Sequence, residues 1–195
     1  MKFILARKLN MTQLFTEDGK VIPVTVLEAL PCKVTKVKTA GDKDKYDAVQ
    51  IGFGKNLAEF RPLDAQYQVG QEIRVSEFEQ GEVVFVSSKS KGRGFAGPMK
   101  RHGFHGAPAS HGHDHPRAVG SIGQRFPQHV RPGLRMAGRM GGKTATVKNS
   151  MIVAVDPKKN LLFVKGGVPG APKTLVKVFT TGVRKSLPNL GSYET

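Results

Sequence analysis

The sequence predicts a mainly β protein in which two β-rich flanks enclose one long basic segment, Lys89–Lys148. Three observations support this fold class. Short runs rich in valine, isoleucine and phenylalanine recur in both flanks, separated by turn-forming residues. Helix signals are confined to Asn56–Phe60 and a short piece after Pro62. The basic segment crowds glycine and proline and is too poor in large aliphatic residues to form a core of its own.

The expected strands follow the alternation of apolar and polar residues. Asp18-Gly19, inside the turn Glu17–Lys20, is a hairpin signal between two of them. In the first flank the strands are expected at Phe3–Leu9, Met11–Phe15, Val21–Leu30, Cys32–Lys38, Asp47–Phe53, Glu72–Phe78 and Glu82–Ser87. After the basic segment the pattern returns at Thr144–Asp156, Leu161–Val168 and Thr174–Thr181.

Short strands joined by tight turns are best closed into a barrel, because closure removes exposed strand edges. The late strands must then pair with the early ones, so the basic segment leaves the barrel and returns to it. We therefore assign residues 1–88 to the first part of the barrel, with a surface insertion at about 40–67, and residues 149–195 to the strands that complete it. A loop as long as residues 89–148 inside a compact domain is either functional or disordered.

Charge is concentrated in the basic segment. It holds twelve of the 31 lysines and arginines, all six histidines and one acid, Asp114, which gives +11, whereas the other residues hold nineteen bases and fourteen acids, or +5. A local surplus of this kind, with a sequence pI near 10.2, points to a phosphate-bearing partner. An anionic lipid surface would fit the charge, but we find no amphipathic helix, no apolar run of spanning length and no signal peptide.

The lone Cys32 excludes an internal disulfide and cannot by itself define a structural zinc site. We interpret it as a small buried apolar side chain.

Gly92–Gly97 satisfies the G-x-G-x-x-G pattern directly after an expected strand. A dinucleotide site requires the third glycine to open a helix whose amino terminus holds the pyrophosphate, and we expect Pro98, Gly103, Gly106 and Pro108 to leave no room for one. We instead interpret the run as a backbone flexible enough to lie against phosphates, with charge from Lys89, Lys91 and Arg93.

The histidines close to Asp114 raise two further hypotheses, a metal site and a serine nucleophile. His111, His113 and His115 stand at alternate positions and cannot converge on one ion without a rigid frame, so we assign no metal. A triad built on Ser110 or Ser121 would also lack a fixed scaffold, so we assign no catalytic residue. Imidazoles can donate hydrogen bonds to phosphate oxygens and stack on bases, so the histidines could contact nucleic acid. The competing interpretation for His113 and His115 is that they are solvated side chains in a mobile loop.

The third portion of the segment is weighted toward arginine, whose planar guanidinium matches phosphate and stacks on bases. Its arginines are Arg125, Arg131, Arg135 and Arg139, spaced by glycines, prolines and methionines. Two alternatives stay open for the aromatic residues Phe95, Phe104 and Phe126: they anchor the segment to the barrel, or they stack on unpaired bases.

The longest motifs resemble one family. The strings KGRGFAGPMKRHGFHGAPASHG, RAVGSIGQ, RMAGRMGG, TVKN and LLFVKGGVPG, with LNMTQLF and AVQIGFG nearer the amino terminus, are similar to the L-three family of universal large-subunit ribosomal proteins, in its bacterial form. The resemblance implies a six-stranded translation-protein-type β-barrel with a long irregular extension rich in Gly, Arg and His, and a small insertion. It also implies a partner, the large-subunit rRNA, bound near its 3′ domain early in assembly.

Carried over by position, the resemblance implies that Lys91, Arg93, Lys100, Arg101, His102 and His105 lie along the rRNA, and that Gly120–Gln124 lies toward the tip of the extension. Gln124 resembles a glutamine that is methylated in some bacterial members. Together with the charge argument, the expected rRNA-binding residues are Lys89, Lys91, Arg93, Lys100, Arg101, His102, His105, His111, Arg117, Gln124, Arg125, Arg131, Arg135, Arg139, Lys143 and Lys148.

The sequence therefore predicts a non-enzymatic structural component of the cytoplasmic large ribosomal subunit that stabilises rRNA near the peptidyl transferase centre. Expected partners are rRNA and neighbouring ribosomal proteins. We expect no membrane partner, no small-molecule substrate and no cofactor. Mg²⁺ is expected only as an ion associated with rRNA. The alternatives are a free nucleic-acid chaperone or nucleoid-type protein, and a metal-dependent hydrolase using the histidines.

Overall fold

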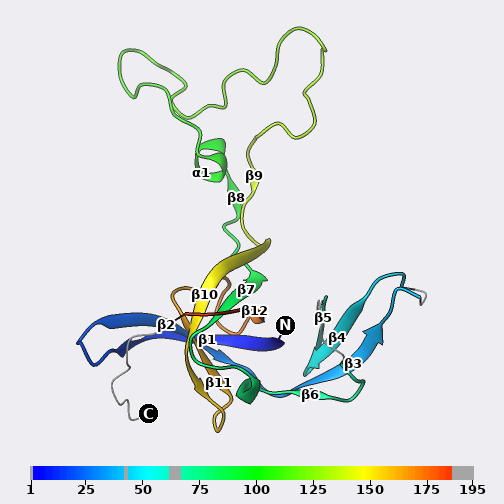
Figure 1. The fold of residues 1–195 in the computed structure, drawn as a ribbon. Helices are drawn as coiled ribbons and strands as arrows, with labels where there is room; N and C mark the ends of the chain where they lie inside the picture. The colour runs from blue at the N-terminus through cyan, green and yellow to red at the C-terminus, as the bar shows by residue number, and fades with distance from the viewer. Residues whose placement is uncertain (1, 42–43, 62–66, 186–195) are drawn as a thin grey trace. The chain divides into compact units, whose positions relative to one another are not determined.

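The computed structural model describes residues 2–41, 44–61 and 67–185, and most of its regular structure is β-strand. The strands are β1 (Phe3–Phe15), β2 (Val21–Glu28), β3 (Cys32–Lys38), β4 (Ala48–Phe53), β5 (Asn56–Phe60), β6 (Glu72–Ile73), β7 (Glu82–Lys89), β8 (Phe95–Ala96), β9 (Gly138–Arg139), β10 (Thr144–Asp156), β11 (Leu161–Lys165) and β12 (Leu175–Arg184). The helices are a 3₁₀ turn, η1 (Val75–Glu77), and one α-helical turn, α1 (Pro98–His102). The prediction of a mainly β chain is confirmed (Figure 1).

The chain divides into two compact units. The first unit is Met1–Ser90 with Thr144–Thr195, and the second unit is Lys91–Lys143. None of the helices in the described part of the chain is long and apolar enough to cross a membrane.

Six strands of the first unit close into a barrel in the order β1-β12-β7-β10-β11-β2, and β2 returns to pair with β1. Every pairing in this ring is antiparallel. Bulges interrupt the ladders, for example between Lys8 and Met11 in β1, and between Val147 and Ser150 in β10. Such bulges increase local twist and help a small sheet to close on itself.

Residues 144–148, which the sequence analysis placed at the end of the basic segment, are the first residues of β10. Thr144 is paired with Lys89, and Val147 with Val86. The ladder between β10 and β7 therefore starts at Thr144, where the chain re-enters the first unit. The alternating Thr-Ala-Thr-Val sequence favours a strand here despite the basic residues around it.

The hairpin predicted at Asp18-Gly19 is confirmed. Phe15 is paired with Val21, the Thr16 amide donates to the Lys20 carbonyl oxygen at 2.9 Å, and Gly19 has φ +76°. Glycine reaches this left-handed conformation at little cost, which explains its place in the turn.

A second sheet, in the order β5-β4-β3-β6, belongs to the same unit. The helix expected at Asn56–Phe60 is wrong, because these residues form strand β5, with Phe53 of β4 paired with Asn56 across a two-residue turn. Gly54 in that turn has φ +58°, and hairpin pairing overrides the weak local helix preference. The strand expected at Glu72–Phe78 is shorter than predicted, because it gives way to η1 after Ile73. The helical piece expected after Pro62 lies outside the described residues.

One apolar cluster joins the barrel to the second sheet. It includes Phe3, Leu27 and Ile152 from the barrel and Cys32 and Ile51 from the second sheet, none more than 1% exposed. The Cys32 thiol is fully buried, and burial raises its pKa to about 11. A thiol with this pKa stays protonated at neutral pH and acts as an apolar side chain, as the sequence analysis expected.

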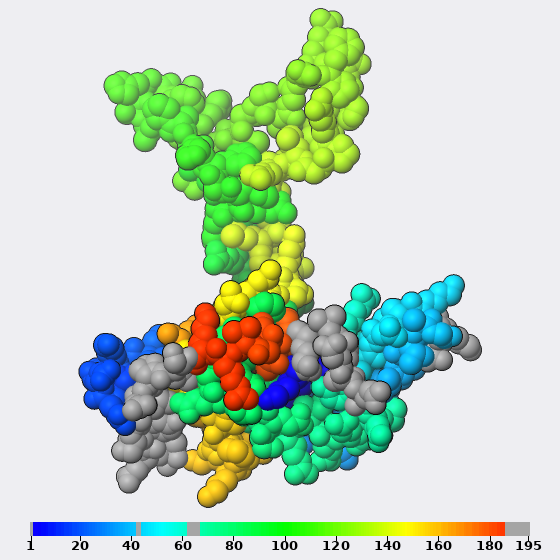
Figure 2. Space-filling model, viewed as in Figure 1, coloured from blue at the N-terminus to red at the C-terminus, as the bar shows by residue number. Residues whose placement is uncertain are grey.

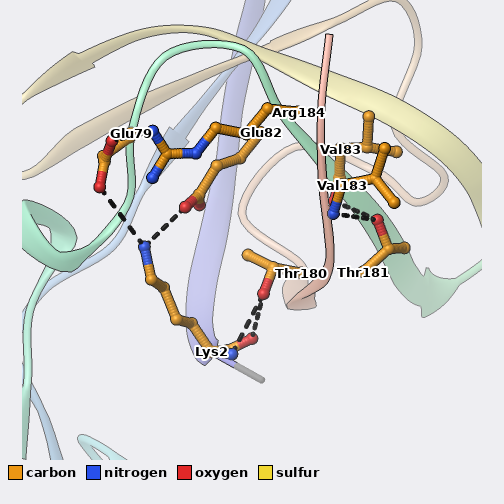
Figure 3. Close-up of polar contacts among 8 residues, drawn as sticks. All are labelled: Lys2, Glu79, Glu82, Val83, Thr180, Thr181, Val183 and Arg184. Carbon is orange, nitrogen blue, oxygen red and sulfur yellow. Dashed lines mark hydrogen bonds and ion pairs between the residues drawn. The ribbon is translucent and has the colours of Figure 1, made fainter.

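Polar contacts fasten the amino-terminal end of β1 to its neighbours (Figure 3). The Lys2 backbone amide donates to Thr180 Oγ1 at 3.1 Å, and Lys2 Nζ lies 2.6 Å from Oε1 of the buried Glu82. Arg184 Nη1 lies 2.6 Å from Glu79 Oε2, on the turn that precedes β7. These contacts add side-chain links to the β1–β12–β7 part of the ring, where residues far apart in the sequence are paired.

Candidate nucleic-acid interface

The second unit is an open structure with little interior. Of its residues 91–143, only Ala96 and Pro98 are buried, and none belongs to an apolar cluster. Above a narrow stem the chain spreads into two loops, drawn in green and yellow-green in Figures 1 and 2. A chain segment without a core has little apolar burial to offset its conformational entropy, so its ordered parts depend on a few backbone and side-chain contacts.

The stem of the second unit is a short antiparallel ladder. Phe95 of β8 is paired with Arg139 of β9, the Arg93 amide donates to the Met140 carbonyl oxygen, and the Met140 amide donates to the Gly94 carbonyl oxygen, both at 2.9 Å. Gly141 closes this ladder with φ +74°. A Cβ atom on Gly141 would collide with the Lys91 carbonyl oxygen, so the stem requires glycine there.

Helix α1 follows β8 directly, and the expectation that no helix could form after Gly97 is wrong. Pro98 occupies the first helical turn, where proline is tolerated, and Gly103 ends the helix with φ +70°. The helix is only five residues long, and β8 pairs antiparallel with β9 instead of forming a parallel βαβ unit. The G-x-G-x-x-G match therefore lacks the architecture of a dinucleotide site.

Helix α1 is tied to the returning strand through one carbonyl group. Arg101 Nη1 donates to the Met136 carbonyl oxygen at 2.7 Å, and His102 Nε2 lies 3.1 Å from the same oxygen. A Cβ atom at Gly138 would lie 2.7 Å from Arg101 Nη1, so glycine makes room for the guanidinium. Arg101 and His102, which were predicted to bind RNA, therefore also have a structural role. No local pattern could indicate it, because Met136 lies 35 and 34 positions away from them.

The lysines and arginines of the basic segment carry charge that no carboxylate of the described residues neutralises. Among the described residues, none of its twelve lysines and arginines forms a salt bridge, whereas bases of the first unit do pair with acids, including Lys38, Arg74 and Arg184. Lys89 lies at the end of β7 and Lys148 in β10, both exposed. The other ten lie in the second unit, namely Lys91, Arg93, Lys100, Arg101, Arg117, Arg125, Arg131, Arg135, Arg139 and Lys143.

Two of the three phenylalanines of the second unit face solvent. Phe95 is 81% exposed and Phe126 is 65% exposed, so neither side chain is packed into the protein. The Arg125 guanidinium lies 5.9 Å from the Phe126 ring centre, which places a cation beside an exposed aromatic face. This arrangement suits base stacking, while Phe104 is partly covered and lies beside His102.

Three histidines of the second unit border one hollow. His105, His113 and His115 border a hollow of about 720 Å³, and His111 is exposed nearby with φ +63°. In the part of the chain that the structure describes, no group of three or more histidine, cysteine, aspartate or glutamate residues could hold a metal ion. Ser121 Oγ donates to the Gly123 carbonyl oxygen at 3.0 Å.

Gln124 lies in the second loop of the second unit. With Ile122, Pro127, His129 and Arg131 it borders a hollow of about 280 Å³. The side chain is exposed and therefore open to solvent in the free protein.

Replacing Gly141 with alanine tests the stem. The substitution places a Cβ atom against the Lys91 carbonyl oxygen at a left-handed φ, a conformation that alone costs an L-residue about 1 to 2 kcal/mol. We expect Gly141→Ala to weaken RNA binding about tenfold or more while the unfolding midpoint of the first unit stays unchanged. Gly167→Ala is the matched control, since Gly167 has open space around it and no left-handed φ and lies in the first unit, outside the residues expected to bind RNA. Equal RNA affinity of the two variants would contradict a role for the stem.

Comparison with known proteins gives a consistent result. The sequence model described as ribosomal protein L3 matches residues 5–159. Large ribosomal subunit protein uL3 of Acidothermus cellulolyticus is 47% identical over 212 residues, covering 95% of both chains. The proteins of the same name from Prochlorococcus marinus (strain MIT 9515) and Carboxydothermus hydrogenoformans are each 45% identical over 200 residues, covering 90% of this chain and 92% and 95% of theirs. The chain therefore belongs to the ribosomal protein L3 family.

Proposed function

We propose that this chain is a structural component of the large ribosomal subunit in the cytoplasm, and that its second unit binds large-subunit rRNA. The observation that carries the proposal is that the lysines and arginines of the second unit form no salt bridges with the described residues, on a unit without a core. Membership of the family makes the chain a structural protein and not an enzyme. Peptide-bond chemistry then belongs to the RNA, and the protein acts by holding nucleotides in place.

The proposal includes the residues expected to contact RNA and the type of barrel to which the first unit belongs. The exposed arginines and lysines of the second unit bind phosphates, and Phe95 and Phe126 stack on unpaired bases. The barrel is of the translation-protein type and docks on rRNA close to neighbouring ribosomal proteins. Binding occurs early in subunit assembly, and the segment stabilises rRNA near the peptidyl transferase centre.

Gln124 is the residue that we propose as a methylation site. Its exposed side chain is accessible to a modifying enzyme before the protein joins the subunit. No metal or organic cofactor is part of the proposal, and Mg²⁺ enters only with the RNA.

The experiment that tests the proposed function is sedimentation of the endogenous protein with large subunits through a high-salt wash. Many phosphate contacts and stacked bases held in a folded particle should retain the protein at a salt concentration that strips charge-only binders. A free nucleic-acid chaperone would instead dissociate steeply, by about 0.7 log units of affinity per tenfold rise in salt for each phosphate contact on single strands. Release of the protein in parallel with such loosely bound proteins would contradict the proposal.

A further inference from the structure

A hollow of about 280 Å³ lies in the first unit, and its lining includes none of the residues expected to bind RNA, although Ser87 and Thr146 stand two positions from Lys89 and Lys148. Its walls come from the barrel strands β1, β7, β10 and β12 and from the end of β5 in the second sheet. The lining includes Glu59, Phe60, Arg61, Lys177 and Phe179, with the hydroxyl pair Ser87 and Thr146.

Strand register explains why these side chains meet. Thr146 is paired with Ser87, and Ser87 with Lys177, so two hydroxyls and one amine form a row across three neighbouring strands. Directly opposed residues in antiparallel strands point to the same face of a sheet. Thr146 Oγ1 lies 3.1 Å from Ser87 Oγ. Phe179, two positions after Lys177 on β12, therefore adds an aromatic ring on that same face.

The aromatic wall from β5 is held in place from behind. Phe60 stacks on Phe3 with ring centres 4.4 Å apart and planes 17° from parallel, and Phe3 is 1% exposed. Phe60 itself is only partly buried, as is Phe179. Both rings are thus available to a ligand, and Phe60 is already ordered by its contact with a core residue.

The hollow carries a positive charge. Lys177 Nζ lies 5.6 Å from the Phe60 ring centre and the Arg61 guanidinium 5.0 Å from that of Tyr46, and neither cation forms a salt bridge with the described residues. The one carboxylate of the lining, Glu59, is already engaged, because its Oε1 lies 2.9 Å from Lys38 Nζ and its Oε2 accepts a hydrogen bond from the Tyr46 hydroxyl at 2.9 Å. The hydrogen bond from Lys38 is the main reason that the pKa of Glu59 is lowered.

We propose that this hollow binds a single unpaired nucleotide of RNA. Its base stacks on Phe60 or Phe179, its polar edge meets the hydroxyls of Ser87 and Thr146, and its phosphate lies near Lys177 and Arg61. The volume is slightly below the range of ligand pockets, roughly 300 to 1,000 Å³, and suits one nucleotide better than a longer stretch. The inference rests on the proposed function and names a specific nucleotide-binding site on the barrel that would dock on rRNA.

The combination of groups favours a nucleotide over a protein segment. An apolar side chain would pack against the aromatic rings but leave both cations without an anion. A nucleotide supplies both a flat base and a phosphate, which are separated by about the length of one sugar. Exposed aromatic rings beside cations bind single-stranded nucleic acid in many folds. A protein partner is the competing occupant, and cross-linking separates the two.

Ultraviolet cross-linking of purified large subunits tests which occupant fills the hollow. After digestion with nuclease and protease, we expect mass spectrometry to find a nucleotide attached to peptides containing Phe60 or Phe179. The variant arm compares subunits carrying Lys177→Ala with subunits carrying Lys158→Ala, which removes an equal charge from the exposed β10–β11 turn. Equal amounts of both variants in the subunits, measured first, exclude a folding defect.

We expect Lys177→Ala to reduce the yield of the Phe60 adduct about fivefold, the effect of losing one charge-assisted phosphate contact, and Lys158→Ala to leave it unchanged. Equal yields in the two variants would overturn the placement of the nucleotide's phosphate near Lys177. Nucleotide adducts confined to residues 91–143 would overturn the inference and leave the proposed function standing. A peptide of another protein attached at Phe60 or Phe179 would overturn it in favour of a protein occupant, and adducts nowhere on the chain would contradict the proposed function itself.

Discussion

Removal of residues 91–142 should leave a folded barrel that no longer joins the large subunit. Lys89 at the end of β7 is paired with Thr144 at the start of β10, so only Ser90 and Lys143 would remain between partnered residues. Two residues are the length of the tightest β-hairpin loop, and Ser90→Asn with Lys143→Gly supplies the Asn-Gly sequence that such loops favour. The variant loses ten of the 31 lysines and arginines, together with Phe95 and Phe126.

The measurements for this variant are thermal unfolding of the purified protein and its sedimentation with large subunits in high salt. We expect cooperative unfolding, because all residues of the apolar clusters lie in the first unit, and no detectable protein in washed subunits. A full-length protein with the substitution Lys158→Ala serves as the incorporation control. Loss of cooperative unfolding would show that the barrel needs the second unit, and normal incorporation would show that the first unit alone holds the protein on the subunit.

Truncation of a core leucine should have the largest effect on stability. Leu27 of β2 is fully buried and paired with Lys8 on β1 and with Leu162 on β11, so it lies at the centre of three adjacent barrel strands. Leu27→Ala leaves a cavity in a closed barrel that cannot easily collapse, and comparable substitutions cost about 2 to 5 kcal/mol. For a chain of this size we expect the unfolding midpoint to fall by about 5 to 15 °C.

Leu30→Ala is the matched control for this measurement. Leu30 is 44% exposed and lies just after β2, so the same chemical change removes little buried surface. We expect its effect on the free energy of unfolding to stay within about 0.5 kcal/mol. Equal destabilisation by the two substitutions would mean that Leu27 does not lie in a packed core.

The barrel strands were predictable because each is a run rich in β-branched and aromatic residues bounded by turns. In LVKVF buried residues alternate with partly buried ones, whereas FILARKL and VIPVTVLE each contain four consecutive buried residues, and Gly19 marks the first hairpin. Strand β5 was not predictable in the same way. Asn56–Phe60 has weak local preference, and its strand exists because β4 and the Gly54 turn place it beside a partner.

The charge of the RNA-binding candidates could be read from composition, but their geometry could not. The crowding of bases between Lys89 and Lys148 requires no knowledge of the fold. In contrast, the contact of Arg101 with Met136 and the meeting of Phe60 with Lys177 join residues far apart in the chain. Such pairs follow from the packing of helix α1 and of the two sheets, and no local pattern predicts them.

The barrel ring also sets an order of events during translation. Phe3 on β1 is paired with Phe179 on β12, so the ring cannot close until nearly the whole chain has been synthesised. At about 5 to 20 residues per second, roughly 10 to 30 s separate the synthesis of the two strands. The β1–β2 hairpin can form early, but until β12 emerges one edge of β1 and one edge of β7 have no partner. Nascent chains stalled before Leu175 should therefore be prone to aggregation, and the cationic second unit emerges from the ribosome while the barrel is still open.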